Sequence, residues 1–308
     1  MKKDLLTLSD LQKNDFEEIF SRTGELKTLQ KKGKSHTPLK GKTLGMIFYK
    51  SSTRTRLSFE VGFSQLGGLA IFLSSRDIQL GRGEAISDTA RIMSRYLDGI
   101  MIRTFSQESI EEFARYSEVP VINGLTDLLH PCQILGDLFT IIEKKGDYKG
   151  LKIAYIGDGN NVANTWLTAA AILPFEFSLA CPEGYEPDKG IMKDALAKAE
   201  GRIKIMRDPF EAAPDADVLY TDVWTSMGQE AEMDERKEAF RGYQINKKLL
   251  SAARKDAIVM HCLPAHRDEE ITSEVIDSPQ SVVFDQAENR LHVQKAVMEI
   301  LIGGGKKK

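Results

Sequence analysis

The sequence predicts an α/β protein with two doubly wound parallel-sheet domains. Apolar runs of strand length alternate with longer segments of helical period, which is typical of parallel sheets covered by helices on both faces. The charged, glycine-flanked segment 144–150 interrupts this alternation, and a second series of strands and helices follows it. A length of 308 residues agrees with two domains of ordinary size.

The first series contains four apolar runs that we interpret as strands, each followed by a segment of helical period. The strand runs are 43–49, 68–74, 99–103 and 119–124, and the helical segments are 54–67, 86–97, 107–116 and 132–145. We also expect a helix of ~10 residues to begin near Ser9. These elements make residues 1–145 the predicted first domain.

The second series has six strand-length runs. They are 151–157, 175–181, 202–206, 217–222, 257–262 and 282–286, with helices expected at 161–173 and near 190–200. The segment 289–302 has apolar residues at helical spacing and predicts an amphipathic helix, which we expect to pack on the first domain. The predicted second domain is therefore 146–288, and 303–308 (GGGKKK) has the composition of a flexible tail.

Composition argues against several classes of protein. The chain is 42% hydrophobic and 28% charged, with a net charge of −3 and a pI of about 6.0, so a nucleic-acid-binding surface is not expected. A signal peptide and a run of ~18 apolar residues are both missing, which predicts a cytoplasmic protein without a membrane span. Cys132, Cys181 and Cys262 lie far apart, as expected of free thiols.

Two nucleotide-binding motifs are incomplete. Gly41-Lys42-Thr43 resembles the end of a P-loop, but His36 stands where that motif requires glycine, and the segment precedes its strand. The turn 157–162 resembles a dinucleotide fingerprint but lacks the third glycine. An NAD-dependent oxidoreductase is therefore the less favoured alternative.

Polar residues cluster where predicted strands end. Ser52, Thr53, Arg54 and Thr55 open a helix directly after strand 43–49, so hydroxyls, amide N–H groups and a guanidinium meet at the positive end of a helix dipole. This arrangement predicts a phosphate site. Similar clusters follow other strands, at Arg103, His130–Gln133, Asn160–Asn161, Asp222, His261–Cys262 and Arg290. Because ligands of doubly wound sheets collect beyond the strand ends, we expect one cleft shared by both domains.

The residue types in these clusters indicate the chemistry. Arg54, Arg103 and Arg290 suit a multiply charged anion, and His130 and Thr55 can hydrogen-bond a polarised carbonyl.

Asp222 suits a substrate ammonium and Asn161 a substrate carboxylate. A metal set of His261, Cys262 and His266 lacks a fourth ligand, and no Ser-His-Asp arrangement stands out. The inventory predicts phosphate-linked group transfer to an amine, without a metal or cofactor.

Seven motifs occur in an order that resembles the aspartate/ornithine carbamoyltransferase family over residues 1–302. They are SSTRTR, DIQLGRGE, HPCQ, GDGNN, DVWTSMG, HCLPAHR and ENR. STRTR and HPxQ are shared across that family and imply carbamoyl phosphate as one substrate. DVWTSMG and HCLP resemble the members that use L-ornithine, and putrescine- and acetylornithine-using relatives differ in these loops.

The resemblance implies a role for each matching residue. The carbamoyl phosphate residues would be Ser52, Thr53, Arg54, Thr55, Gln79, Arg103, His130, Gln133, Cys262, Leu263 and Arg290. The ornithine residues would be Asn161, Asp222, Ser226 and Met227, and the catalytic residues Thr55, Arg103, His130 and Cys262. In this family the loop containing Gln79 reaches a neighbouring subunit's site, which implies a homotrimer or a multiple of trimers.

Several alternatives remain open at this point. Arg56 lies one turn into its helix and can pair with Glu60 instead of binding phosphate. Two other functions remain: a carbamoyltransferase for a different amine, and a non-catalytic binding or regulatory protein on the same scaffold.

Overall fold

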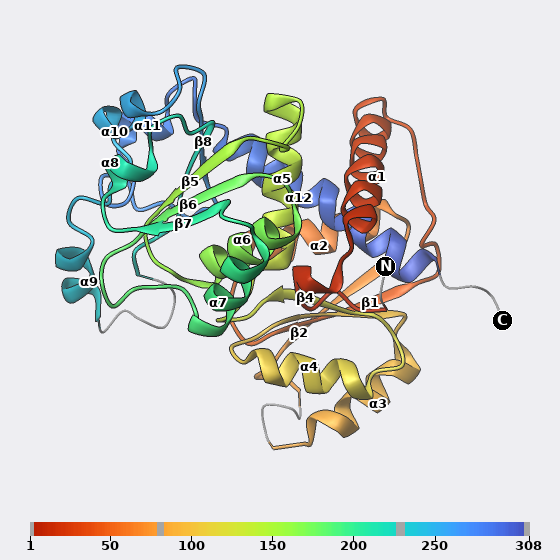
Figure 1. Cartoon of the computed structure of the whole chain (residues 1–308). Helices are drawn as coiled ribbons and strands as arrows, with labels where there is room; N and C mark the ends of the chain where they lie inside the picture. Colours follow the sequence, from red (N-terminus) through yellow and green to blue (C-terminus); the bar gives the residue numbers. More distant parts are fainter. Residues whose placement is uncertain (1–2, 79–82, 226–231, 305–308) are drawn as a thin grey trace. The chain divides into compact units, whose positions relative to one another are not determined.

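The computed structural model describes residues 3–78, 83–225 and 232–304 (Figure 1). The chain forms two compact units, unit 1 comprising Met1–Phe139 with Glu288–Lys308 and unit 2 comprising Thr140–Ala287. Each unit contains one parallel sheet with helices on both of its faces. The prediction of two doubly wound α/β domains is therefore confirmed.

The unit 1 sheet has the strand order β2-β1-β3-β4, and every pair is parallel. Its strands are β1 (Thr43–Phe48), β2 (Leu69–Ser74), β3 (Gly99–Arg103) and β4 (Val121–Leu125). Connections leave β1 toward opposite edges, so the strand order reverses between β1 and β3. Ligands of such sheets bind beyond the strand ends at this point.

Helices of unit 1 lie on both faces of this sheet. They are α1 (Lys13–Lys31), α2 (Thr53–Gln65), α3 (Ile86–Tyr96), α4 (Gln107–Tyr116), the first part of α5 (Pro131–Lys145), most of α12 (Val283–Met298), a 3-10 turn at Leu8–Asp10 and a π-helical turn at Glu299–Gly303. Figure 1 shows α3 and α4 on one face and α1, α2 and α12 on the other. The Ser52 and Ser106 hydroxyls cap the first turns of α2 and α4.

The unit 2 sheet has the order β7-β6-β5-β8-β9 and is also parallel. Its strands are β5 (Lys152–Ile156), β6 (Glu176–Ala180), β7 (Ile203–Met206), β8 (Val218–Thr221) and β9 (Ile258–His261). The helices are the end of α5, α6 (Asn161–Ile172), α7 (Lys189–Lys198), α8 (Pro209–Ala212), α9 (Met233–Ala239), α10 (Lys247–Ala252), α11 (Ser273–Ile276) and the start of α12. Here the strand order reverses between β5 and β8.

Alternating side chains of β5 build two different cores in unit 2. Tyr155 stacks on Tyr220 with ring centroids 5.6 Å apart, and Trp166 of α6 meets Tyr220 edge-on. Ala154 and Ile156 face the opposite way, into an aliphatic cluster that includes residues of α8, α10 and α11. Aromatic packing therefore fixes α6, the helix that begins at the polar turn after β5.

Two sequence predictions about secondary structure are wrong. The run 282–286 is predicted as a strand, but the isolated bridge to Val259 is made by Ser281, just before the run, and α12 begins at Val283. Short apolar runs do not distinguish a strand from a buried helix end. The first long helix is α1, with 19 residues from Lys13, because Gln12 and Asp15 form its capping box; only the 3-10 turn lies near Ser9.

Candidate active site

The first turn of α2 presents the predicted phosphate residues. Ser52 is the N-cap, and its hydroxyl accepts from the Thr55 amide at 3.2 Å. Thr53 is exposed and Arg54 is half-buried. Among the described residues no hydrogen bond or ion pair engages the Arg54 guanidinium, whereas Arg56 pairs with Glu60 at 3.1 Å. The structure therefore contains the Arg56–Glu60 ion pair, which was the alternative to phosphate binding by Arg56.

Thr55 lies at the centre of the unit 1 site. Its buried hydroxyl accepts from Arg103 Nη1 at 3.4 Å and from Arg290 Nη2 at 3.2 Å. Arg103 ends β3, as predicted, but Arg290 lies in α12 and not after a strand. The hydroxyl oxygen thus accepts from two cations, and no acceptor for its proton lies among the residues that the structure describes.

His130 and Gln133 belong to the start of α5. Gln133 Oε1 accepts from Arg290 Nη1 at 2.7 Å, and its Nε2 donates to the buried Asp137 carboxylate at 2.8 Å, so its amide has one orientation. Burial, together with the charges of Arg290 and Arg103, holds the pKa of His130 well below its usual 6.5. His130 is therefore a neutral imidazole at neutral pH.

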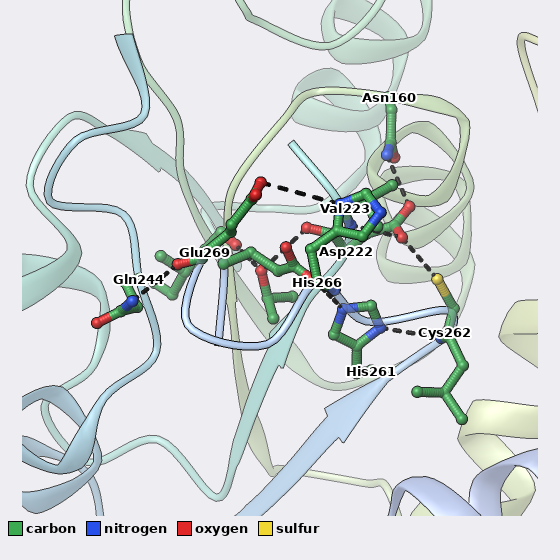
Figure 2. A network of polar contacts seen from close by, with 12 residues as sticks. Asn160, Asp222, Val223, Gln244, His261, Cys262, His266 and Glu269 are labelled. Atoms are coloured by element: carbon green, nitrogen blue, oxygen red, sulfur yellow. Dashed lines mark hydrogen bonds and ion pairs between the residues drawn. The ribbon is translucent and has the colours of Figure 1, made fainter. Parts of the chain in front are cut away.

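Asp222, after β8, is the centre of the unit 2 site (Figure 2). Its Oδ1 accepts from the Cys262 thiol at 2.8 Å and from the Val223 amide at 2.8 Å. Its Oδ2 accepts from Asn160 Nδ2 at 2.8 Å. An ionised carboxylate has about four acceptor positions, so these donors leave one on Oδ2 for a ligand.

Asn160 and Asn161 open α6 and have different tasks. Asn160 Oδ1 caps the helix by accepting from the Val162 and Ala163 amides, while its Nδ2 holds Asp222. Asn161 is the first residue of α6, at the carboxyl end of β5. The sequence marked Asn161 as a ligand residue and missed the positioning contact of Asn160.

The loop after β9 is held by a buried pair. His261 and Glu270 are fully buried, with Nε2 and Oε1 2.8 Å apart. Because His261 Nδ1 accepts from the Leu263 amide at 2.9 Å, its proton lies on Nε2 and is donated to Glu270. The same Glu270 oxygen accepts from the His266 amide at 2.7 Å. This pair fixes the turn that carries Cys262 and Leu263, where Leu263 has φ +54° and precedes a cis proline.

A buried ion pair braces the turn after β5. Arg236 Nη1 donates to Asp158 at 3.1 Å and to the Trp224 carbonyl at 2.9 Å. Burial raises the pKa of Asp158 to about 6, although the charge of Arg236 opposes that rise. Because Asp158 is two residues before Asn160, α9 and the turn after β5 are joined through this contact.

Within each unit, the structure brings most of the predicted site residues together. Thr55, Arg103, Gln133 and Arg290 form one network in unit 1, and Asp222 and Cys262 form another in unit 2. Gln79, Ser226 and Met227 lie outside the described residues. Sequence reasoning placed Asn160 in a polar cluster without assigning its contact to Asp222, and it missed Glu270, Asp158 and Arg236, although Asp158 lies in the quoted motif GDGNN.

Two groups of possible metal ligands occur in the part of the chain that the structure describes. They are Asp222, His261 and Cys262, and His266, Glu269 and Glu270. In the first group the Cys262 thiol already donates a hydrogen bond to the Asp222 carboxylate, and both ring nitrogens of His261 have hydrogen-bond partners in the protein. We assign no metal to either group.

Comparisons with known proteins match both halves of the chain to one family. Residues 3–143 match the aspartate/ornithine carbamoyltransferase carbamoyl-P binding domain, and residues 149–301 match the Asp/Orn binding domain of the same family. The chain is 68% identical to an ornithine carbamoyltransferase of Syntrophus aciditrophicus, over 98% of this chain and all of the relative. It is 59% identical to one of Geobacter metallireducens, with the same coverage.

The solved structures lead to the same family. The ornithine carbamoyltransferase of Pyrococcus furiosus superimposes with a TM-score of 0.95 at 53% identity, covering 99% of this chain and 98% of that one. The enzyme of Burkholderia thailandensis gives 0.90 at 48% identity, covering 98% and 99%. This chain belongs to the aspartate/ornithine carbamoyltransferase family.

Proposed function

We propose that the chain is an ornithine carbamoyltransferase. It transfers the carbamoyl group of carbamoyl phosphate to the δ-amine of L-ornithine, giving L-citrulline and phosphate in arginine biosynthesis. The observation that carries this proposal is the Thr55 hydroxyl at the start of α2, which accepts from both Arg103 and Arg290. Family membership and the Asp222–Cys262 contact of unit 2 support it.

Carbamoyl phosphate binds to unit 1 in this proposal, and ornithine to unit 2. We assign residues 1–145 with the C-terminal helix to the first role and 146–288 to the second. Ser52, Thr53, Arg54 and Thr55 hold the phosphate with amide N–H groups, hydroxyls and one guanidinium. Gln133 and His130 bind the carbamoyl end, Arg290 closes on the anion, and Cys262 and Leu263 contact the carbamoyl group.

The oxyanion that forms during attack is stabilised by Thr55, Arg103 and His130. Thr55 has two lone pairs engaged by arginines, so its proton is available to a substrate oxygen. Since His130 is neutral, it donates an N–H to the substrate oxygen without adding a positive charge to those of Arg103 and Arg290. Such donors act most strongly when they are fixed before reaction, and Arg103 and His130 are buried.

Ornithine is oriented by Asp222, Asn161 and the segment with Ser226 and Met227. The remaining acceptor position of Asp222 receives the α-ammonium, and Asn161 with Met227 holds the carboxylate. Cys262, fixed by its bond to Asp222, lies beside the attacking nitrogen. An ornithine δ-amine has a solution pKa of ~10.4, so the site must favour its neutral form, which attacks the carbamoyl carbon. The proton that the nitrogen loses after attack is assigned to the phosphate that departs as its C–O bond breaks.

Binding of carbamoyl phosphate comes first in this scheme. The bound anion compensates the positive charges of unit 1 and completes the surface that receives ornithine. The segment with Ser226 and Met227 then excludes water from the reacting groups.

We further propose that the protein is a homotrimer, or a multiple of trimers, with Gln79 reaching a neighbouring subunit's site. An exposed apolar face of unit 1 supports assembly; it comprises Leu57 and Val61 of α2 with Leu69 and Phe72 of the edge strand β2. Leu69 is 61% exposed, and these four side chains line a groove of about 840 Å³. Apolar patches of this kind mark protein interfaces. Ultracentrifugation measures the oligomeric state of wild type and of Leu69→Lys. A monomeric wild type refutes assembly, and a variant with the same oligomeric state as wild type refutes this face as the interface.

A cytoplasmic location fits the free cysteines and is part of the proposal. Among the described residues, no helix has the length and apolarity needed to cross a membrane. The reaction needs neither metal nor cofactor, because the substrates carry the reacting groups.

A citrulline-forming assay tests the proposed function. Purified protein is given carbamoyl phosphate with L-ornithine, and in parallel with aspartate, putrescine or N-acetylornithine. We expect product with ornithine and at least ~100-fold lower kcat/KM with the other amines, because a site built for particular polar groups rejects analogues that lack them. Faster reaction with another amine selects the different acceptor, and no reaction with any amine favours a non-catalytic protein.

A further inference from the structure

Gln294 contacts one of the proposed carbamoyl phosphate residues from the neighbouring turn of α12. It lies four residues after Arg290 and is fully buried. With its amide oxygen toward Arg290, Gln294 accepts from Nε at 3.1 Å and from Nη2 at 3.0 Å. The Nη2 group of Arg290 is thereby shared between Gln294 and Thr55, while Nη1 donates to Gln133.

The other end of the Gln294 amide holds α2. Its nitrogen donates to Ser58 Oγ at 2.5 Å, and the Ser58 hydroxyl donates to the Arg54 carbonyl at 2.6 Å. Gln294 therefore connects Arg290 to the first turn of the helix that carries the phosphate residues. Each end of the amide has a matching partner in only one orientation, so the contact has one geometry.

The chemistry of the amide suits this position. A carboxylate at residue 294 would pair with the guanidinium and cancel the charge intended for the substrate. An apolar side chain would leave the buried Nε–H without the acceptor that Gln294 supplies. An amide fixes the guanidinium and leaves its charge in place, and Thr55 and Gln133 are likewise neutral acceptors.

We infer that Gln294 is a positioning residue for carbamoyl phosphate binding, which aligns the Arg290 guanidinium with the first turn of α2. This inference rests on the proposed function for the identity of the anion. It assigns to α12 a second residue of the site, one that lies outside the ENR motif and touches no substrate.

The test compares two variants of near-equal size, Gln294→Met and Gln294→Glu, by calorimetry with carbamoyl phosphate and by steady-state kinetics. Gln294→Met loses both hydrogen bonds to the charged Arg290, and the loss of one such bond alone corresponds to about tenfold, so we expect the Kd of carbamoyl phosphate to rise about tenfold or more. Gln294→Glu should weaken binding at least as much. The KM for ornithine and kcat, at saturating carbamoyl phosphate, should change less than about threefold.

Lys295→Met is the matched control, because Lys295 is the next residue of α12 and donates to Gln30 of α1 and Gln65 of α2, away from Arg290. It should lower Tm and leave the Kd of carbamoyl phosphate within about twofold. Ser58→Ala removes the far end of the bridge and should weaken carbamoyl phosphate binding in the same direction. If Gln294→Met fails to fold, Ser58→Ala and Gln294→Glu give the result.

A double variant separates positioning from general stabilisation. If Gln294 acts only through Arg290, Arg290→Met/Gln294→Met should bind carbamoyl phosphate as weakly as Arg290→Met alone. Additive losses, or an unchanged Kd in Gln294→Met, overturn the inference. If wild type binds carbamoyl phosphate but makes no citrulline, the proposed function fails, and the Kd values still decide the role of Gln294. If wild type does not bind carbamoyl phosphate, both the proposed function and the role of Gln294 are refuted.

Discussion

Thr55→Val isolates the donor role of a single hydroxyl. Valine has nearly the shape of threonine, so the buried site is filled, but the acceptor of Arg103 and Arg290 and the free O–H are lost. The two arginine contacts, at 3.4 and 3.2 Å, are longer than the ~2.9 Å of a strong bond. We therefore expect the free energy of unfolding to fall by only about 1 kcal/mol.

The catalytic loss should be much larger, because removal of one preformed oxyanion donor costs about 10²- to 10³-fold in kcat, near 3 kcal/mol. Citrulline formation at saturating substrates measures it, and chemical denaturation measures stability on the same samples. Thr55→Ser keeps the hydroxyl and should retain kcat within about tenfold. If Thr55→Val keeps kcat within about threefold, Thr55 donates nothing to the transition state and its hydroxyl serves only to space the arginines.

Three further predictions concern separate parts of the site. Arg54→Ala should remove measurable carbamoyl phosphate binding in calorimetry while the protein stays folded; unchanged affinity would disprove the phosphate assignment. Asp222→Ala should raise the KM for ornithine or lower kcat, with carbamoyl phosphate affinity nearly intact, and an unaltered ornithine response would reject its role. The pKa of His130 lies below 6.5 in the folded protein, so as pH falls the imidazole of the unfolded chain takes up a proton before that of the folded protein does. The stability that neutral His130 contributes is therefore present above pH 6.5 and is lost as pH falls through the folded pKa. The loss of Tm between pH 7 and 5 should be smaller in His130→Gln, and an identical loss in both proteins would contradict the burial argument.

The fold was predictable where local pattern and tertiary environment agree. Buried strands such as β3 and β5 are continuous apolar runs bounded by polar residues, and the helix starts carry capping residues such as Ser52 and Asn160. The pattern failed at 282–286, where the same apolar composition begins a helix. Whether such a run joins a sheet depends on the strands beside it, and β9 gives this segment only a single bridge.

The site was predictable to the extent that its residues lie at strand ends. Arg103 and Asp222 have that signal, and each is brought into its network as the parallel topology requires. Glu270 and Gln294 have no such signal. The contact of Glu270 with His261 depends on the path of a loop, and that of Gln294 with Arg290 depends on which face of α12 is buried. Sequence spacing thus finds the groups that meet substrates more readily than those that hold them.

The charges of the site are positioned by partners that do not cancel them. Arg290 is held by the neutral side chains of Thr55, Gln133 and Gln294, and Asp222 by the neutral donors of Asn160, Cys262 and the Val223 amide. A buried charge already paired with an opposite charge has little left to offer a ligand, whereas a neutral hydrogen bond fixes geometry at small electrostatic cost. The buried ion pair Arg236–Asp158 lies one step further away, where cancellation of charge stabilises the turn before Asn160 without weakening Asp222. Unit 1 thereby presents guanidinium groups suited to a phosphate, and unit 2 a carboxylate suited to an ammonium.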